Sequence, residues 1–209
     1  ILVNTHHKKG VMEEFLNRDR FHGLVSYTYE PKFLGTGGTL LANKDFFQDK
    51  TTLFIHADNW CHCDFQAFID FHCNHRPANT IMTMMTFCTP TPSSCGIVEL
   101  DNKGIVQQFH EKVINPPGNL ANAAIYLLEP EVLDIVQNLP NVSDFDIDVM
   151  PSLLGKIATW ENTNIHRDIG TLDSLLEAQN DPVSSLDSSS LDDWQRDFEK
   201  NSIHNILKI

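Results

Sequence analysis

Short apolar stretches rich in β-branched residues alternate with amphipathic stretches along the first 90 residues of the chain. The apolar stretches have the length of β-strands, and the amphipathic stretches have the three-to-four-residue spacing of helices. This pattern predicts strands at residues 1–5, 25–29, 52–56 and 80–87, and helices at 11–17, 39–47 and 64–75. Strands separated by helices of this length are typical of βαβ units, so we expect an α/β fold with a mainly parallel sheet.

The pattern changes near residue 96, where two strands follow one another without a helix between them. Residues 96–100 and 105–109 flank the turn sequence Asp101-Asn102-Lys103-Gly104, which predicts a β-hairpin. Residues 157–160 and 164–167 predict a second hairpin. The remaining expected elements are a strand at 123–128 and helices at 130–137, 148–156 and 171–179.

The composition shifts after Asn180. Residues 181–190 are rich in serine and contain Pro182, which is typical of a linker. Residues 191–209 have the spacing of a last amphipathic helix. We therefore expect one domain over residues 1–180, followed by a linker and C-terminal helix over residues 181–209.

The chain of 209 residues is acidic, with 28 Asp and Glu against 15 Lys and Arg and a formal net charge of −13. This balance argues against nucleic acid or an anionic membrane as a partner, but it allows a small phosphorylated substrate whose charge local cations or a metal offset. No apolar stretch is long enough to span a bilayer. The five cysteines are irregularly spaced, which does not suggest a disulfide framework, so we expect a cytoplasmic protein.

Two carboxylates follow predicted strands. Asp58 comes directly after the apolar strand at 52–56, and Asp168 comes after the strand at 164–167. Ligands of parallel α/β sheets bind at the carboxyl ends of strands, so each acid is a reasonable ligand for Mg²⁺, and the two could share one ion. Each could equally cap the turn or helix that follows it.

A Gly-rich stretch and a pair of opposite charges are further candidates for ligand binding. The glycines of residues 35–38 would let the backbone approach a ligand, with helical N–H groups just behind, although such a stretch can be a simple turn. Glu111 could accept hydrogen bonds from hydroxyl groups and Lys112 could meet a phosphate, although adjacent opposite charges can also be a solvated surface pair.

The cysteines and histidines between residues 56 and 75 raise a different possibility, a zinc-binding module. The residues concerned are His56, Cys61, His62, Cys63, His72, Cys73 and His75. The Cys61-His62-Cys63 pairs lack the two-to-four-residue spacing of structural zinc sites, which favours packing or surface roles instead.

Eight short motifs follow one another along the chain. They are Asn4-Thr5-His6, Glu30-Pro31 with Leu34-Gly35-Thr36-Gly37-Gly38, Asp58-Asn59, Gly96-Ile97-Val98, Phe109 with Glu111-Lys112, Asn122-Ala123-Ala124-Ile125-Tyr126, Asp148-Val149 with Pro151, and Asp168-Ile169-Gly170-Thr171. In this order and spacing they resemble the motifs of the sugar-phosphate nucleotidyltransferases, and most of all the branch of the mannose-1-phosphate guanylyltransferases. The resemblance covers about residues 1–180.

The resemblance implies a doubly wound, Rossmann-like α/β core with small antiparallel insertions for the sugar. It also implies a reaction in which a sugar 1-phosphate attacks the α-phosphorus of a nucleoside triphosphate, giving a nucleotide-sugar and pyrophosphate. GTP and mannose 1-phosphate, and hence GDP-mannose, are the expected pair. Thymine or uracil with glucose, or a heptose, stay open, and so does the oligomeric state, for which a homo-oligomer is one option.

The resemblance also implies roles for single residues. Asp58 and Asp168 would hold Mg²⁺ and Lys112 would meet the sugar phosphate, so these three are the expected catalytic residues. Glu111 would bind the sugar hydroxyl groups. The full set of expected substrate-binding residues is Glu30, Gly35, Thr36, Gly37, Asn59, Gly96, Glu111 and Asn122.

The chain departs from the family at its start and at three single positions. In the family, a strand and a Gly-rich loop bearing Arg and Lys wrap the triphosphate; that segment would precede Ile1, so we expect an N-terminally incomplete domain. Ala57, Val113 and Ala124 stand where the family usually has Gly, Pro and Gly. The alternative hypothesis is therefore a non-catalytic relative or regulatory subunit that binds a sugar phosphate or a nucleotide-sugar.

Overall fold

The computed structural model describes residues 1–182, 193, 196–197 and 200, so the expected linker and C-terminal helix lie almost wholly outside the described residues. The chain forms two compact units. One comprises Ile1–Phe33 and the described residues from Gly170 onward, and the other comprises Leu34–Ile169. Among the described residues, no helix combines the length and the apolar character needed to cross a bilayer.

The unit that contains the N-terminus begins with a strand, a helix and a second strand. β1 (Leu2–Thr5) and β2 (Ser26–Tyr29) pair in parallel, and α1 (Lys9–Leu16) lies between them in the chain. This is the βαβ arrangement that the sequence pattern predicts. In the same unit, α7 (Leu172–Ala178) begins with a capping box formed by Thr171 and Ser174, close to the predicted helix at 171–179.

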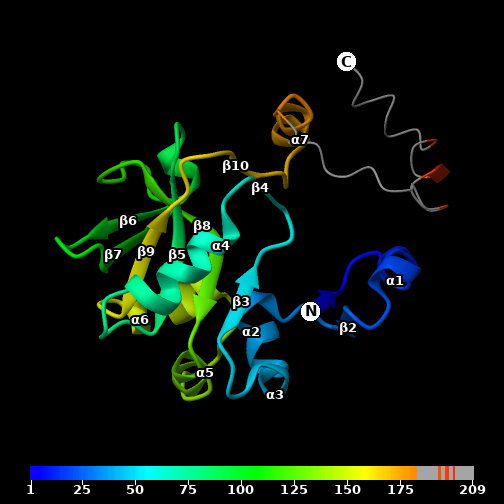
Figure 1. Cartoon of the computed structure of the whole chain (residues 1–209), viewed down its shortest axis with the longest axis horizontal. Helices are drawn as coiled ribbons and strands as arrows, with labels where there is room; N and C mark the ends of the chain where they lie inside the picture. The colour runs from blue at the N-terminus through cyan, green and yellow to red at the C-terminus, as the bar shows by residue number, and fades with distance from the viewer. Residues whose placement is uncertain (183–192, 194–195, 198–199, 201–209) are drawn as a thin grey trace. The chain divides into compact units, whose positions relative to one another are not determined.

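The larger unit is built on a six-stranded sheet (Figure 1). Its strands are β3 (Thr52–Ile55), β5 (Met82–Cys88), β6 (Gly96–Leu100), β7 (Val106–Glu111), β8 (Leu120–Leu128) and β9 (Ile157–Glu161). The strand order is β7-β6-β8-β5-β9, and β3 pairs with the C-terminal half of β8. Two further short strands, β4 (Asn59–Cys61) and β10 (His166–Asp168), pair with each other.

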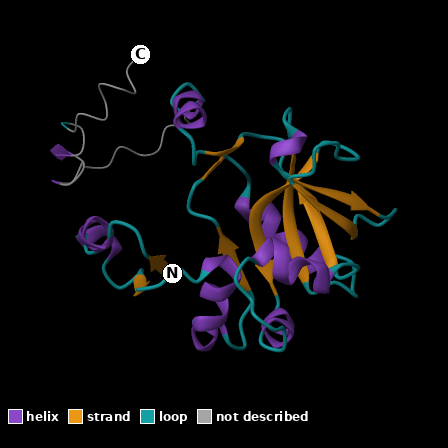
Figure 2. Ribbon diagram, turned by 180° about the vertical axis from the view of Figure 1, so that it is seen from behind, coloured by secondary structure: helices purple, strands orange, loops and turns teal. Residues whose placement is uncertain are grey.

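Helices cover both faces of this sheet, as Figure 2 shows from behind. The helices concerned are α2 (Gly35–Ala42), α3 (Lys44–Phe47), α4 (Phe65–Asp70), α5 (Pro130–Val136) and α6 (Met150–Leu153). Tyr126 and Leu128 of β8 pack in one core cluster with residues of α2, α5 and α6. Ile125 and Leu127 pack in a second cluster with Phe68 of α4. This period-two alternation places β8 at the centre of the unit and confirms the α/β class.

The sheet is mixed, which differs from the mainly parallel sheet that the pattern predicts. β8 runs antiparallel to β3, β5 and β6, and in this sheet only β5 and β9 pair in parallel. The chain reverses its direction at the turn of the β6–β7 hairpin, because a tight turn joins antiparallel strands. β7 and β8 both run antiparallel to β6, so they point the same way, and residues 112–119 join them across β6 without a helix.

The predicted hairpin of residues 157–160 and 164–167 is wrong. β9 pairs in parallel with β5, and β10 pairs antiparallel with β4, so the two segments have different partners. Asn162 explains the separation: its backbone N–H donates to Thr86 O at 2.8 Å, while its side-chain Nδ2 donates to His62 O at 3.1 Å. The first hairpin, β6–β7, is confirmed.

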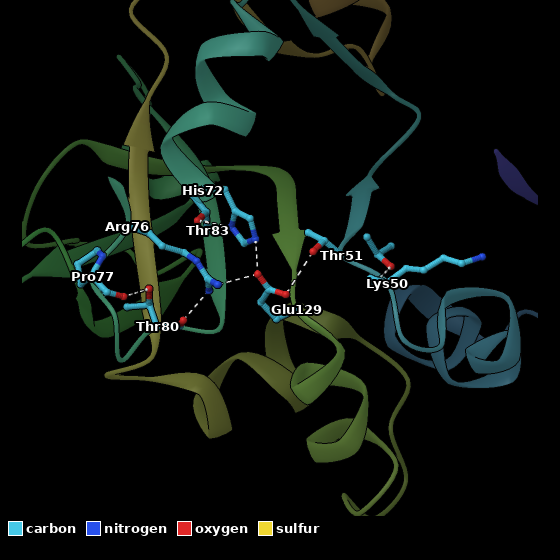
Figure 3. A network of polar contacts seen from close by, with 9 residues as sticks. Lys50, Thr51, His72, Arg76, Pro77, Thr80, Thr83 and Glu129 are labelled. Carbon is cyan, nitrogen blue, oxygen red and sulfur yellow. Dashed lines mark hydrogen bonds and ion pairs between the residues drawn. The ribbon is translucent and has the colours of Figure 1, made fainter. Parts of the chain in front are cut away.

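A network of polar side chains ties three elements together at the end of β8 (Figure 3). His72, on the π-helical turn Phe71–His75 that continues α4, lies 2.7 Å from Thr83 Oγ1 through Nδ1 and 3.0 Å from Glu129 Oε1 through Nε2. Arg76 donates to the same Glu129 oxygen at 2.6 Å. The other carboxylate oxygen accepts a hydrogen bond from Thr51 at 3.2 Å, just before β3.

We expect the free energy of unfolding to fall as the pH is lowered from 7 to 5. Burial, followed by the charge of Arg76, lowers the pKa of His72 below its ordinary value of about 6.5. The unfolded chain therefore takes up this proton more readily, so the stability that neutral His72 confers is complete above about pH 6.5 and is lost below it.

Urea denaturation at pH 7, 6 and 5, followed by far-ultraviolet circular dichroism, measures this dependence. The variant His72→Gln should show a flatter pH profile than the wild type. The matched control is His75→Gln, since His75 lies on the same turn with an exposed side chain. Equal slopes for His72→Gln and the wild type would contradict the expectation.

Candidate functional site

The two predicted metal ligands lie on neighbouring backbone segments. β4 begins at Asn59 and β10 ends at Asp168, and these two residues are partners in the antiparallel register. The N–H of Ile169 donates to the carbonyl oxygen of Asp58 at 2.8 Å. Asp58 and Asp168 are both exposed. The fold thus brings together two acids that are far apart in the sequence.

The side chain of Asn59 anchors this strand pair to the sheet. Its Nδ2 donates to the carbonyl oxygen of Ala123 at 3.0 Å. Because Ala123 lies on β8, the bond fixes the position of β4, and therefore of Asp58, relative to the central strand. Asn59 has a structural task here, and its predicted contact with the substrate stays a prediction.

A pair of carboxylates fits magnesium better than zinc. Mg²⁺ usually takes one or two carboxylates and completes its shell with substrate phosphates and water. In the described part of the chain, no group of three or more His, Cys, Asp or Glu side chains could hold a metal by itself. Two members of the Cys/His set have other neighbours: Cys61 Sγ lies 4.0 Å from Met85 Sδ, and His72 belongs to the Glu129 network.

The end of the β6–β7 hairpin holds the predicted sugar-phosphate residues. Gly96 is the register partner of Glu111, and a Cβ at position 96 would lie 2.5 Å from the Phe109 ring and 2.7 Å from Glu111 Oε2. A side chain at position 96 would therefore displace the Phe109 ring or the Glu111 carboxylate. Lys112 has a φ of 48°, in the left-handed region, and its Nζ lies 3.3 Å from Glu111 Oε1.

Lys112, at the end of this hairpin, interacts electrostatically with three carboxylates, those of Glu111, Asp146 and Asp168. Glu111 contributes most to the raised pKa of Lys112, and the carboxylates of Asp146 and Asp168 raise it further. The ammonium group is therefore cationic at neutral pH and lies within the electrostatic influence of a predicted metal ligand. The structure pairs Lys112 with Glu111, and the predicted roles of these two residues and of Asp168 stay predictions.

Asp146 is a third acidic residue of the site, and the sequence analysis did not assign it a role. It lies on the π-helical segment η4 (Phe145–Val149), and its Oδ1 accepts hydrogen bonds from Tyr126 Oη at 2.8 Å and Asn122 Nδ2 at 3.3 Å. Burial raises its pKa, and the charge of Glu111 raises it further. Asn122, a predicted substrate ligand, thus belongs to a side-chain triad with Tyr126 and Asp146.

β8 bends between the two members of this triad that it carries. Ala124 has a φ of 51°, in the left-handed region, and the pairing with β5 shifts register between Met84 and Thr86. A left-handed alanine costs about 1–2 kcal/mol, which accounts for the glycine that the family usually has here. The Asn122 side chain supports the bend, because its Oδ1 accepts the Ala124 N–H at 3.0 Å.

The Gly-rich stretch is the first turn of a helix that packs against the segment before η4. α2 begins at Gly35, four residues before the predicted start, and ends at Ala42. Ser143 O accepts the N–H groups of Gly37 at 2.8 Å and Gly38 at 3.0 Å. The hydroxyl of Thr36 accepts the N–H of Phe145 at 2.8 Å.

Close packing explains the glycines of this turn. Gly35 has a φ of 78°, and a Cβ there would lie 2.5 Å from Ser143 O. A Cβ on Gly37 would lie 2.7 Å from Val142 Cγ1. These residues position the segment that carries Asp146, which is a task that the sequence analysis missed. Their predicted contact with a substrate stays a prediction.

Glu30 belongs to the unit that contains the N-terminus. Its side chain is only 3% exposed, and Asn4 Nδ2 donates to Glu30 Oε1 at 3.4 Å. The ring of His6 lies 2.8 Å from the backbone oxygen of Glu30 through Nδ1. The contact of Glu30 with a substrate, which the resemblance implies, stays a prediction.

The fold of this chain is similar to that of solved nucleotidyltransferase structures. A structure from Bacillus anthracis, described as a glucose-1-phosphate thymidylyltransferase, superposes with a TM-score of 0.73 at 20% identity, over 85% of this chain and 74% of that one. HddC from Yersinia pseudotuberculosis, in complex with GMP-PN, gives a TM-score of 0.69 at 19% identity, over 85% and 76% of the two chains. At these identities the likeness supports the fold.

Curated proteins that are similar in sequence bear the names of mannose-1-phosphate guanylyltransferases. The mannose-1-phosphate guanylyltransferase of Mycobacterium tuberculosis is 27% identical over 89% of this chain and 52% of its own length. A mannose-1-phosphate guanyltransferase of Kluyveromyces lactis is 30% identical over 67% of this chain and 40% of its own length. The chain therefore spans about half the length of the curated relatives that it matches.

The family model described as "Nucleotidyl transferase" matches residues 1–185. This range includes every motif from Asn4-Thr5-His6 to Asp168-Ile169-Gly170-Thr171. The resemblance inferred from these motifs is confirmed, and the chain belongs to the sugar-phosphate nucleotidyltransferase family.

Proposed function

We propose that this chain supplies the sugar-phosphate site and the metal-binding carboxylates of an enzyme that makes a nucleotide-sugar and pyrophosphate. Its substrates are a nucleoside triphosphate and a sugar 1-phosphate, and its cofactor is Mg²⁺. GTP and mannose 1-phosphate are the proposed pair, because the curated relatives named above are mannose-1-phosphate guanylyltransferases.

One observation carries the proposal. Lys112 lies within the electrostatic influence of both Asp168, a predicted metal ligand, and Asp146, a member of the triad with Asn122. Lys112 Nζ also lies 3.3 Å from Glu111 Oε1, so a cation and a hydroxyl acceptor stand side by side for a sugar 1-phosphate. A solvated surface pair of Glu111 and Lys112 would require no such neighbours.

The residues of the chain would divide the work by charge. In the reaction, an oxygen of the sugar 1-phosphate forms a bond to the α-phosphorus, and the bond from that phosphorus to the bridging oxygen breaks, so that pyrophosphate leaves with the electron pair. Lys112 offsets the charge of the attacking phosphate, and Glu111 orients the sugar by accepting from its hydroxyl groups. Asp58 and Asp168 would hold Mg²⁺, which neutralises phosphate charge when bound.

The test is pyrophosphate release by the 209-residue chain with Mg²⁺, across four nucleoside triphosphates and a panel of sugar 1-phosphates. We expect release with GTP and mannose 1-phosphate above every other pair. Saturable binding of a sugar 1-phosphate without release from any pair would favour the non-catalytic relative. If the chain neither releases pyrophosphate nor binds a sugar 1-phosphate, the proposal is contradicted.

A further inference from the structure

Three acidic residues, Asp144, Asp146 and Asp148, alternate along the segment at residues 144–148. Asp144 and Asp148 accept hydrogen bonds from nearby backbone N–H groups, whereas Asp146 does not. Asp144 Oδ1 accepts the N–H groups of Asp146 and Ile147 at 2.9 and 3.0 Å. Asp148 Oδ2 accepts the N–H groups of Ser143 and Asp144, each at 2.8 Å. The carboxylates of Asp144 and Asp148 are therefore explained by the backbone N–H groups that they accept, whereas that of Asp146 is not.

The side chain of Asp146 is fixed through one oxygen only. Both of its hydrogen bonds, from Tyr126 Oη and Asn122 Nδ2, end on Oδ1, so within the described part of the chain Oδ2 is left for another donor. Tyr126 is fully buried and holds its hydroxyl group in one place. A carboxylate with one oxygen clamped and one available is prepared for a ligand.

Asp146 lies at the edge of the core, next to buried Tyr126, and interacts with charged side chains outside the core. The charges of Glu111 and Lys112 both interact with Asp146, and these residues end the hairpin above Gly96. His56, whose Nε2 is buried without a hydrogen-bond partner among the described residues, also interacts electrostatically with Asp146. Asp146 is half-buried, and burying a carboxylate has a desolvation cost, which favours a functional reason for an acid at this position.

We propose that Asp146 reads a hydroxyl group of the sugar ring through Oδ2 and is a specificity-determining residue of the sugar site, with Tyr126 as its positioning residue. This inference rests on the proposed function, since it assumes that the site binds a sugar 1-phosphate. A carboxylate accepts a hydroxyl proton in a short, charge-assisted hydrogen bond. A site built around such a bond rejects an analogue that lacks the hydroxyl, because the acceptor is then left unpaired.

The experiment is calorimetric titration of the full chain with mannose 1-phosphate, with its 2-, 3-, 4- and 6-deoxy analogues, and with inorganic phosphate. We expect the wild type to bind one deoxy analogue at least about tenfold more weakly than the parent sugar. Asp146→Asn, which keeps the shape of the side chain, should weaken binding of the parent sugar by a similar factor and bind that analogue no more weakly than the parent.

The controls separate recognition of the sugar from recognition of charge. Inorganic phosphate should bind to Asp146→Asn as tightly as to the wild type or more tightly, because the variant loses a negative charge near Lys112. Asp134→Asn removes the same charge from α5, away from the triad, and should leave every affinity unchanged. Tyr126→Phe should weaken the parent sugar by a smaller factor, and it supplies the test if Asp146→Asn fails to fold.

The outcomes are distinguishable. Wild-type binding of mannose 1-phosphate with unchanged affinity in Asp146→Asn would overturn this inference and leave the proposed function intact. Equal weakening of the parent sugar and of all four analogues by Asp146→Asn would also overturn it, because the variant would then disturb the site as a whole. A wild type that binds no sugar 1-phosphate would overturn both.

Discussion

Replacing Asp58 by asparagine should lower the rate of pyrophosphate release by about 10²–10³-fold in an enzyme that contains this chain. The variant removes one of two carboxylates that would hold Mg²⁺, and an amide is a weaker ligand for a hard cation. The fold should be unaffected, because Asp58 is exposed and the bond from Ile169 N–H goes to its backbone oxygen. Release assays and thermal unfolding on the same preparation measure both effects.

Asp168→Asn should show the same loss, since the two acids lie on paired strands. The matched control is Asp45→Asn, which removes the same charge from an exposed position on α3 and should leave turnover unchanged. Full turnover in Asp58→Asn would refute the assignment of this pair as metal ligands.

Gly35→Ala should lower the free energy of unfolding by about 3 kcal/mol, the combined effect of a left-handed alanine and of overpacking. The new methyl group would lie 2.5 Å from the backbone oxygen of Ser143, which has little freedom to move because it accepts two N–H groups of α2. Urea denaturation at pH 7 measures the change.

The control for this variant is Gly118→Ala, in the loop before β8. A Cβ at Gly118 would meet nothing within 4 Å, and its φ is outside the left-handed region, so the expected change is within about 0.5 kcal/mol. Equal stability of the two variants would contradict the packing of the α2 turn against Ser143. In that case the predicted contact with a ligand would be the remaining explanation for glycine at position 35.

Local signals in the sequence predicted local structure well. The prediction of the β6–β7 hairpin is correct because the residues of the turn stabilise it by themselves. Asp101 Oδ1 accepts the N–H groups of Lys103 and Ile105, and Gly104 takes a φ of 75°. The helix at 64–75 begins as predicted, with Asp64 accepting the N–H of Ala67. The meeting of Asp58 and Asp168 could also be predicted, because family motifs preserve such long-range placements.

Pairings between distant strands could not be predicted in the same way. The continuous apolar run of β8 at residues 123–128 is typical of a strand buried on both faces, but it carries no information on which strands lie beside it or in which direction they run. Asp146 was missed for a related reason. In the sequence it stands between Asp144 and Asp148, two acids with ordinary capping roles, and its contacts with Asn122 and Tyr126 exist only in the folded chain.

The bond between Thr36 and Phe145 joins residues 109 positions apart. Such a contact requires a long loop to close, which has an entropic cost that a contact between near neighbours in the sequence does not have. During synthesis, the Gly-rich turn leaves the ribosome more than a hundred residues before the segment that it must grip. A nascent chain that ends before residue 145 contains β3 and the β6–β7 hairpin, yet it lacks Asp146 and Asp168. The substrate site that we propose would therefore be complete only once the last third of the chain has been made.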